Sequence, residues 1–98
     1  MYREIIELKK DISTETLNEI QDICISAHDN RVGKVGIKRI SQHCFVFEGG
    51  EADFMCLTLG YLQLDDIQIF RDNVISWWWE DEDPNESCDL FKELSEII

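Results

Sequence analysis

Three consecutive tryptophans, Trp77, Trp78 and Trp79, lead directly into the acidic run Glu80–Asp83. Residues 74–79 are rich in the β-branched and aromatic residues that strands favour. On a strand, Trp77 and Trp79 point to one face and Trp78 points to the other. A chain of 98 residues cannot easily bury both faces of a sheet, so we expect at least one tryptophan to be partly exposed.

Residues 14–28 carry the clearest helical pattern in the chain. The hydroxyl of Ser13 can accept a hydrogen bond from a free backbone N–H of the first turn, as an N-cap does. Apolar residues then recur at helical spacing, namely Leu17, Ile20, Cys24 and Ala27. This pattern predicts a helix from about Thr14 to His28.

The remaining segments favour strands and turns. Residues 4–9 predict a short strand, and residues 31–42 a basic connector containing glycine. The pair Gly49-Gly50 between two strand-like runs predicts a hairpin of 43–48 with 51–55. A second hairpin is expected from 67–70 and 74–79, joined by a turn at 71–73.

Residues 56–64 fit either a strand or a helix. Leu57, Leu59 and Tyr61 alternate as on a strand, whereas other apolar residues of the segment also fit a helix. Thr58 and Gly60 favour the strand. A turn is expected at Asp65-Asp66.

The C-terminal segment predicts a second helix. Asp83 can serve as its cap, Pro84 suits the first helical position, and Glu86 follows three residues after the cap. The chain is therefore expected to form one α+β domain over residues 1–98. Its small antiparallel sheet would have about four to five strands in two hairpins, packed with a helix in the N-terminal half and a C-terminal helix.

The distribution of charge is strongly uneven. Residues 1–50 hold 7 basic and 8 acidic residues, whereas residues 51–98 hold 2 and 13, and the whole chain has a net charge of -12. Direct binding to a phosphate backbone requires Lys and Arg, so it is not expected. An acidic surface instead fits a basic protein partner, whose positive groove it could enter.

Cysteine usage and hydropathy predict a cytoplasmic protein. Each of the four cysteines lies among apolar residues of a predicted element, and no secretory signal is recognisable, so free thiols are expected. No apolar run approaches the ~20 residues that a membrane-spanning helix needs.

These observations predict a small acidic inhibitor that occludes the basic groove of a nucleic-acid-handling protein. Phage anti-defence proteins, such as anti-CRISPR proteins, and immunity proteins against toxin nucleases work in this way. Trp is a preferred interface anchor, and neighbouring carboxylates steer a cationic partner. The expected partner-binding residues are Trp78, Trp79, Glu80, Asp81, Glu82 and Asp83, extended by Asp65, Asp66, Asp72 and Glu86.

The sequence also contains features of other functional classes. Gly33-Lys34-Val35-Gly36 resembles the Gly-x-x-Gly loop of KH domains, and this resemblance implies a module that grips a nucleic-acid backbone. A homodimer through exposed tryptophans is a further alternative.

Cys24, His28, His43 and Cys44 could supply zinc ligands, but their spacing matches no zinc pattern. No catalytic signature is recognisable, so neither an enzyme, a metal nor a cofactor is expected.

Overall fold

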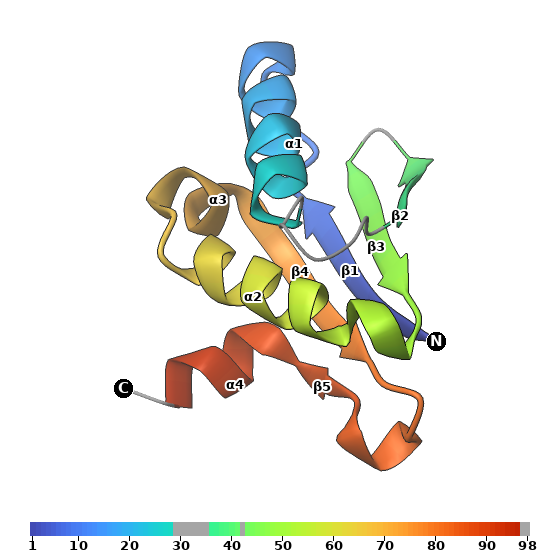
Figure 1. Cartoon of the computed structure of the whole chain (residues 1–98). Coiled ribbons are helices and arrows are strands. Elements are labelled where there is room, and N and C mark those ends of the chain that lie inside the picture. Colours follow the sequence, from blue (N-terminus) through green and yellow to red (C-terminus); the bar gives the residue numbers. More distant parts are fainter. Residues whose placement is uncertain (29–35, 42, 97–98) are drawn as a thin grey trace.

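The computed structural model of the protein describes residues 1–28, 36–41 and 43–96. All neighbouring strands are antiparallel, and they form one five-stranded sheet in the order β2-β3-β1-β4-β5. The strands are β1 (Tyr2–Leu8), β2 (Gly36–Ser41), β3 (Cys44–Gly49), β4 (Val74–Glu80) and β5 (Cys88–Asp89). The helices are α1 (Thr14–His28), α2 (Phe54–Asp65), α3 (Gln68–Asn73) and α4 (Leu90–Glu96), with short 3-10 turns η1 (Glu51–Asp53) and η2 (Pro84–Glu86). The predicted α+β class with a small antiparallel sheet is confirmed (Figure 1).

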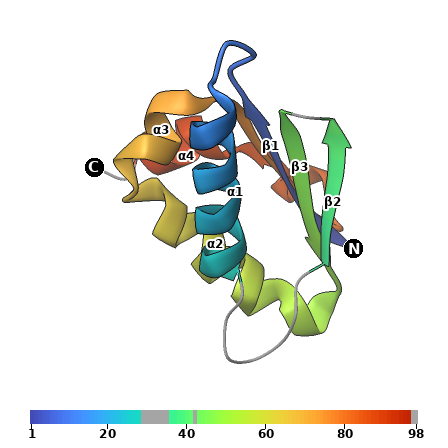
Figure 2. The same cartoon turned by 90° about the horizontal axis from the view of Figure 1, so that it is seen from above.

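The helices of the described chain gather on one face of the sheet. Figures 1 and 2 show α1 and α2 on the same side of β1 and β3. On that face Trp77 contacts Phe70 of α3 and Phe91 of α4. The opposite face, which we call the open sheet face, carries Ile5 of β1 and Trp78 of β4 as direct neighbours. The sheet therefore has one buried face and one face without a helix among the described residues.

Helix α1 spans the residues that its pattern predicts. The backbone N–H of Thr16 donates to the Ser13 hydroxyl at 3.2 Å, which caps the helix. Its core stripe extends to the C-terminal end of the helix, and its buried residues are Leu17, Ile20, Cys24, Ala27 and His28. Strand β1 is also as predicted, although it begins at Tyr2.

The predicted hairpin of 43–48 with 51–55 is wrong. Strand β3 pairs with β1 and β2, and the chain after Gly50 enters η1 and then α2. In the observed register Glu48 lies opposite Arg3, whereas the predicted hairpin would have placed it opposite Glu51. Opposite charges on neighbouring strands stabilise a sheet and like charges destabilise it. The basic connector expected at 31–42 contains β2, and its residues 31–35 and 42 lie outside the described part.

The preference for a strand at 56–64 is wrong, because these residues belong to α2. The helix buries Cys56, Leu57, Gly60 and Leu64, a spacing that places them on one side of a helix. No residue from Phe54 to Leu64 is charged. A segment that is apolar on nearly all sides can be buried in either form, so tertiary packing decides between them.

The second predicted hairpin is also wrong in its first half. Residues 68–73 form α3, held by local bonds from Gln68 to the Asp72 carboxylate at 2.7 Å and from Asn73 to the Ile69 carbonyl at 2.8 Å. Such bonds between residues four apart favour a helix. The second half is correct, since β4 covers the predicted strand 74–79, and Asp66 forms the expected turn.

The C-terminal helix begins later than predicted. The Asp83 carboxylate accepts from the Asn85 N–H at 3.0 Å, as a cap should, but only the single turn η2 follows. Cys88 and Asp89 then pair with β4, which interrupts the helix. Helix α4 starts at Leu90, where the Asp89 carboxylate accepts from the Phe91 N–H at 3.0 Å.

Candidate partner-binding surface

The three tryptophans alternate across the sheet as predicted. Trp77 and Trp79 face the helices and are 1% and 5% exposed, whereas Trp78 is 39% exposed on the open sheet face. The Trp79 ring packs against Tyr2, Phe54 and Tyr61 at centroid distances of 5.8, 6.0 and 5.5 Å. Of the two anchors that the sequence suggested, only Trp78 is available to a partner.

The segment Asp81–Ser87, which we call the acidic loop, follows β4 and is held in shape by its own carboxylates. The Asp81 carboxylate accepts from the indole N–H of Trp79 and from the backbone N–H of Asp83, both at 3.0 Å. The backbone N–H of Asp81 donates to the Ser87 hydroxyl at 3.0 Å. Two of the predicted binding residues, Asp81 and Asp83, thus organise the loop. Glu82 and Glu86 are exposed side chains of the same loop.

Two exposed ion pairs border the acidic loop. Glu80 accepts from Arg3 at 2.8 Å, and the carboxylate of Glu82 lies 2.8 Å from the amino group of Met1. All four side chains or groups are between 42% and 54% exposed. Exposed pairs of this kind contribute little to stability. Arg3 and the amino group of Met1 are therefore held only weakly by these carboxylates.

Carboxylates from several elements converge around Tyr2 and Cys88. Burial raises the pKa of the Tyr2 hydroxyl, and the charges of Glu82, Asp81 and Glu51 raise it further. Burial raises the pKa of the Cys88 thiol, and nearby carboxylates add to this in the order Glu93, Asp89, Asp81 and Glu86. These carboxylates come from η1, the acidic loop, β5 and α4.

Sequence reasoning missed three members of this group, Glu51, Asp89 and Glu93. Glu51 was assigned to a hairpin that does not form. Asp89 and Glu93 follow Glu86 in the same acidic stretch and lie on either side of the start of α4. The sequence alone thus indicated that they could extend the acidic surface.

The predicted residues Asp65, Asp66 and Asp72 lie apart from the acidic loop. They belong to the end of α2, the following turn and α3, just before β4 begins, whereas the loop follows the end of β4 (Figure 1). A seven-residue strand spans about 20 Å. Asp65 forms an ion pair with Arg71, and Asp72 accepts from Gln68. The expected continuous acidic surface is therefore divided into two groups at opposite ends of β4.

A buried polar cluster joins β1, α1 and β4, and sequence reasoning missed it. Glu4 is 0% exposed and His28 is 2% exposed. One oxygen of Glu4 lies 2.5 Å from Nε2 of His28, and the other accepts from the indole N–H of Trp77 at 2.6 Å. His28 donates through Nδ1 to the Cys24 carbonyl at 2.7 Å, because a carbonyl oxygen only accepts.

The surroundings of the cluster determine its protonation. Burial lowers the pKa of the His28 imidazole, but the hydrogen bond and charge of Glu4 and the Cys24 carbonyl outweigh it and raise the pKa above its ordinary value. The imidazole stacks on Phe47 with ring centroids 3.9 Å apart. With the Glu4 carboxylate on one ring nitrogen and the Cys24 carbonyl on the other, the imidazole belongs to a closed hydrogen-bonded unit inside the core.

A signal for this cluster was present in the sequence. Glu4 shares the alternation of Ile6 and Leu8, which places it on the buried face of β1. His28 lies four residues after Cys24, on the core stripe of α1. The two residues could thus have been assigned to the core, although their pairing depends on the fold.

The remaining residues that the sequence singled out are the cysteines, the histidines and the Gly-x-x-Gly segment. All four cysteines are free thiols, as expected. Within the described residues, no three metal-binding side chains come together, and the ring nitrogens of His28 are engaged in the buried cluster. Of the Gly-x-x-Gly segment, residues 33–35 lie outside the described part, and Gly36 begins β2.

Comparisons with known proteins supply no relative. A scan against protein-family models gives no match, and searches for similar curated proteins and for similar solved structures give none either. Across the part of the chain that is described, no helix has both the length and the apolar character needed to cross a bilayer. Any functional proposal therefore depends on the chemistry of the surface itself.

Proposed function

We propose that this chain is a small acidic binding protein that inhibits a nucleic-acid-handling protein by occupying its basic groove. The observation that carries the proposal is the acidic loop, in which Glu82 and Glu86 are exposed while Asp81 and Asp83 hydrogen-bond within the loop. A local negative potential attracts a cationic groove and orients the encounter. The carboxylates would then stand where phosphate groups lie in the natural complex.

The hydrogen bonds within the acidic loop support this role. Because Asp81 and Asp83 hold the loop before any partner arrives, binding needs little further ordering. Glu80, Glu82 and Glu86 are then presented to the partner's Lys and Arg side chains. Trp78 supplies an apolar anchor on the open sheet face, opposite Asp89 of β5.

The second acidic group, Asp65, Asp66 and Asp72, extends the contact. It lies about 20 Å from the acidic loop along β4, so a long groove could engage both. The nuclease complexes that phages disarm have basic grooves, and so do the toxin nucleases that immunity proteins neutralise. The proposal therefore covers either kind of partner.

The decisive experiment measures inhibition of nucleic-acid cleavage by a panel of purified RNA-guided nuclease complexes and toxin nucleases. We expect the chain to inhibit at least one of them in competition with nucleic acid. The double variant Glu82→Lys with Glu86→Lys should lose about tenfold or more in affinity, because it reverses two exposed charges and leaves Asp81 and Asp83 in place. Inhibition of no panel member would contradict the proposal.

A matched control changes the net charge equally at another place. Asp11→Lys with Glu15→Lys reverses two exposed carboxylates at the start of α1. It should keep nearly all of the affinity. Equal losses in the two double variants would show that only the overall charge matters, and the acidic loop would then be excluded as the binding surface.

Two simpler measurements separate the alternatives. A nucleic-acid-binding module using Gly33 to Gly36 should be retained on heparin, whereas an acidic inhibitor should bind only an anion exchanger at low salt. Light scattering after size exclusion distinguishes a homodimer through Trp78 from a monomer. Binding to heparin would favour the nucleic-acid-binding module over the proposed inhibitor. A stable dimer that buries Trp78 would favour the homodimer.

A further inference from the structure

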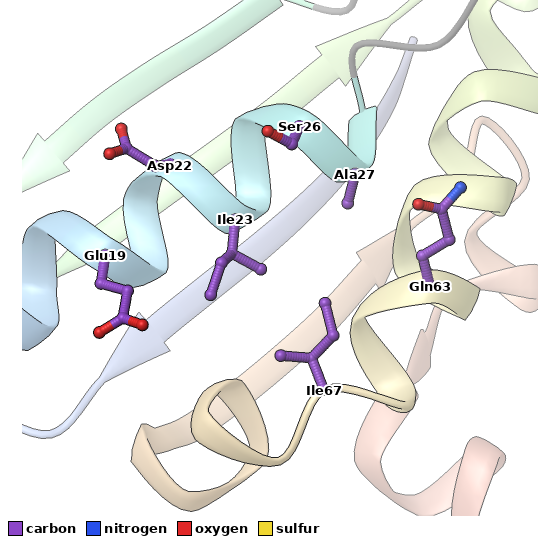
Figure 3. Close-up of a pocket in the computed structure, with 7 residues that line it drawn as sticks. All are labelled: Glu19, Asp22, Ile23, Ser26, Ala27, Gln63 and Ile67. Atoms are coloured by element: carbon purple, nitrogen blue, oxygen red, sulfur yellow. The ribbon is translucent and has the colours of Figure 1, made fainter.

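A groove of about 380 Å³ separates α1 from the end of α2. Figure 3 shows Ile23 of α1 and Ile67, which follows α2, directed toward each other across the groove. Ala27 adds to its apolar lining, and Gln63 lies on the α2 side. A volume in this range is typical of sites that accept a side chain or a small ligand.

The α1 side of the groove is negative. Glu19 and Asp22 line it, and both are exposed to solvent. None of the described residues that line the groove is cationic. The groove thus combines a hydrocarbon lining with carboxylates at one side, which suits the aliphatic stem and charged head of a lysine or arginine.

An exposed apolar stripe continues from the groove along α2. Met55, Leu59 and Leu62 are 59%, 40% and 44% exposed, and they recur at helical spacing. Leu59 lies four residues before Gln63, so the stripe and the groove share one side of α2. Apolar side chains aligned in this way are typical of a surface that receives a helix.

We propose that this helical face, formed by the groove and the α2 stripe, binds a basic amphipathic helix of a partner protein. The helix would lay its apolar side on Met55, Leu59 and Leu62. One of its lysine or arginine side chains would enter the groove, with its stem against Ile23 and Ile67 and its charge near Glu19. This contact goes beyond the acidic loop, because it uses other residues and another kind of partner segment.

Charge complementarity selects this occupant. A second copy of the chain would bring another net charge of -12 to a face whose α1 side is already acidic. Anionic lipid is repelled for the same reason. A cationic helix satisfies both halves of the surface, because its apolar side covers the stripe and its charges meet the carboxylates.

The test uses a synthetic helical peptide of about 18 residues with leucines on one side and lysines on the other. Its matched control has the same lysines with serines replacing the leucines. In a two-dimensional NMR titration of the labelled protein, we expect the leucine peptide to shift the amide signals of Ile23, Gln63 and Ile67. The serine peptide should bind about tenfold or more weakly.

Variants of the protein test which residues contact the peptide. Glu19→Lys with Asp22→Lys should weaken the leucine peptide about tenfold, whereas Asp11→Lys with Glu15→Lys should leave binding nearly unchanged. Leu59→Ser should also weaken it, while thermal unfolding confirms that the variant is folded. Shifts confined to the acidic loop, equal binding of both peptides, or no binding would each overturn the groove assignment. None of these variants alters Glu82 or Glu86. The result of the peptide titration is therefore independent of the result of the inhibition assay.

Discussion

Glu4 and Glu82 carry the same carboxylate in opposite surroundings. Glu4 is fully buried, and both of its oxygens meet nitrogen groups of neighbouring elements. Glu82 lies in the acidic loop, half exposed, beside the amino group of Met1. A buried carboxylate is costly unless it is paired and hydrogen-bonded, whereas an exposed one keeps its water. The position of an acidic residue in this chain therefore decides whether it stabilises the core or contributes an exposed negative charge.

The two regions should therefore respond differently to substitution. Changes in the buried cluster of Glu4, His28 and Trp77 should alter the free energy of unfolding. Changes at the exposed carboxylates of the acidic loop should alter binding and leave stability nearly intact.

The largest effect is expected for Glu4→Leu. The substitution leaves His28 and the Trp77 indole N–H without their buried partner, so it should lower the free energy of unfolding by about 3 to 5 kcal/mol. Urea unfolding measures the change. Glu7→Leu, on the open sheet face of the same strand, is the control and should cost less than about 1 kcal/mol. Similar losses for the two variants would remove the distinction between the faces.

Gly60→Ala should come next. A methyl group at Gly60 would lie 2.6 Å from Nε2 of His28, which is closer than packed atoms allow. We expect a loss of about 1 to 3 kcal/mol in the free energy of unfolding. Gly50→Ala is the matched control, because a methyl group there meets no atom within 4 Å and the backbone φ is -86°. If Gly60→Ala were as stable as Gly50→Ala, the close packing of α2 on His28 would be wrong.

The pH dependence of stability should change sign in Glu4→Gln. The pKa of His28 is raised in the folded protein, so its contribution is complete below about pH 6.5 and is lost as pH rises through the folded value. Without the charge of Glu4, burial dominates and lowers this pKa, so stability should instead increase with pH through this range. Each slope is at most about 1.4 kcal/mol per pH unit. Unfolding curves between about pH 5 and about pH 8 measure this dependence. Parallel slopes for the two proteins would show that Glu4 does not control the proton.

A smaller effect is expected in the acidic loop at Asp81. Asp81→Ala removes the acceptor for the Trp79 indole and the Asp83 N–H, so it should cost about 1 kcal/mol. Glu82→Ala should stay within about 0.5 kcal/mol of the original chain. Thermal unfolding of the two variants compares them directly. A larger loss for Glu82→Ala would mean that the exposed ion pair, not Asp81, holds the loop.

The smallest effect concerns the Cys88 thiol. Carboxylates around it help to raise its pKa, so salt should screen them and speed its alkylation about two- to threefold. Cys44, where burial and Glu7 raise the pKa, is the internal control and should respond less. Mass spectrometry of each labelled peptide gives the two rates. An equal response would argue against a concentrated negative potential near Cys88.

Sequence patterns predicted the elements whose signals are local. Helix α1 has a cap and a regular stripe, and β4 has an alternation that placed Trp78 on the open sheet face. Helix α2 was missed because Phe54–Leu64 is apolar on nearly every side, and such a segment is equally compatible with a strand. Its helical form depends on packing, including the close approach of Gly60 to His28.

The candidate sites were predicted to a similar extent. The run Glu80–Asp83 was recognisable as an acidic surface beside tryptophan. Its separation from Asp65 and Asp66 was not, because the predicted strand at 67–70 would have placed these two residues near the end of β4, whereas the chain forms α3 there. The partners of Glu4 were equally hidden, since the order β3-β1-β4 is a property of the whole sheet.

The central position of β1 in the sheet has a consequence for how the chain is made. The ribosome synthesises this strand first, yet Glu4 finds its indole partner 73 residues further along the chain. Until β4 emerges, β1 lacks one of its two neighbouring strands and the Glu4 carboxylate lacks its indole partner. Contacts so distant in sequence slow folding, so the domain should reach its native state only after β4 has been synthesised.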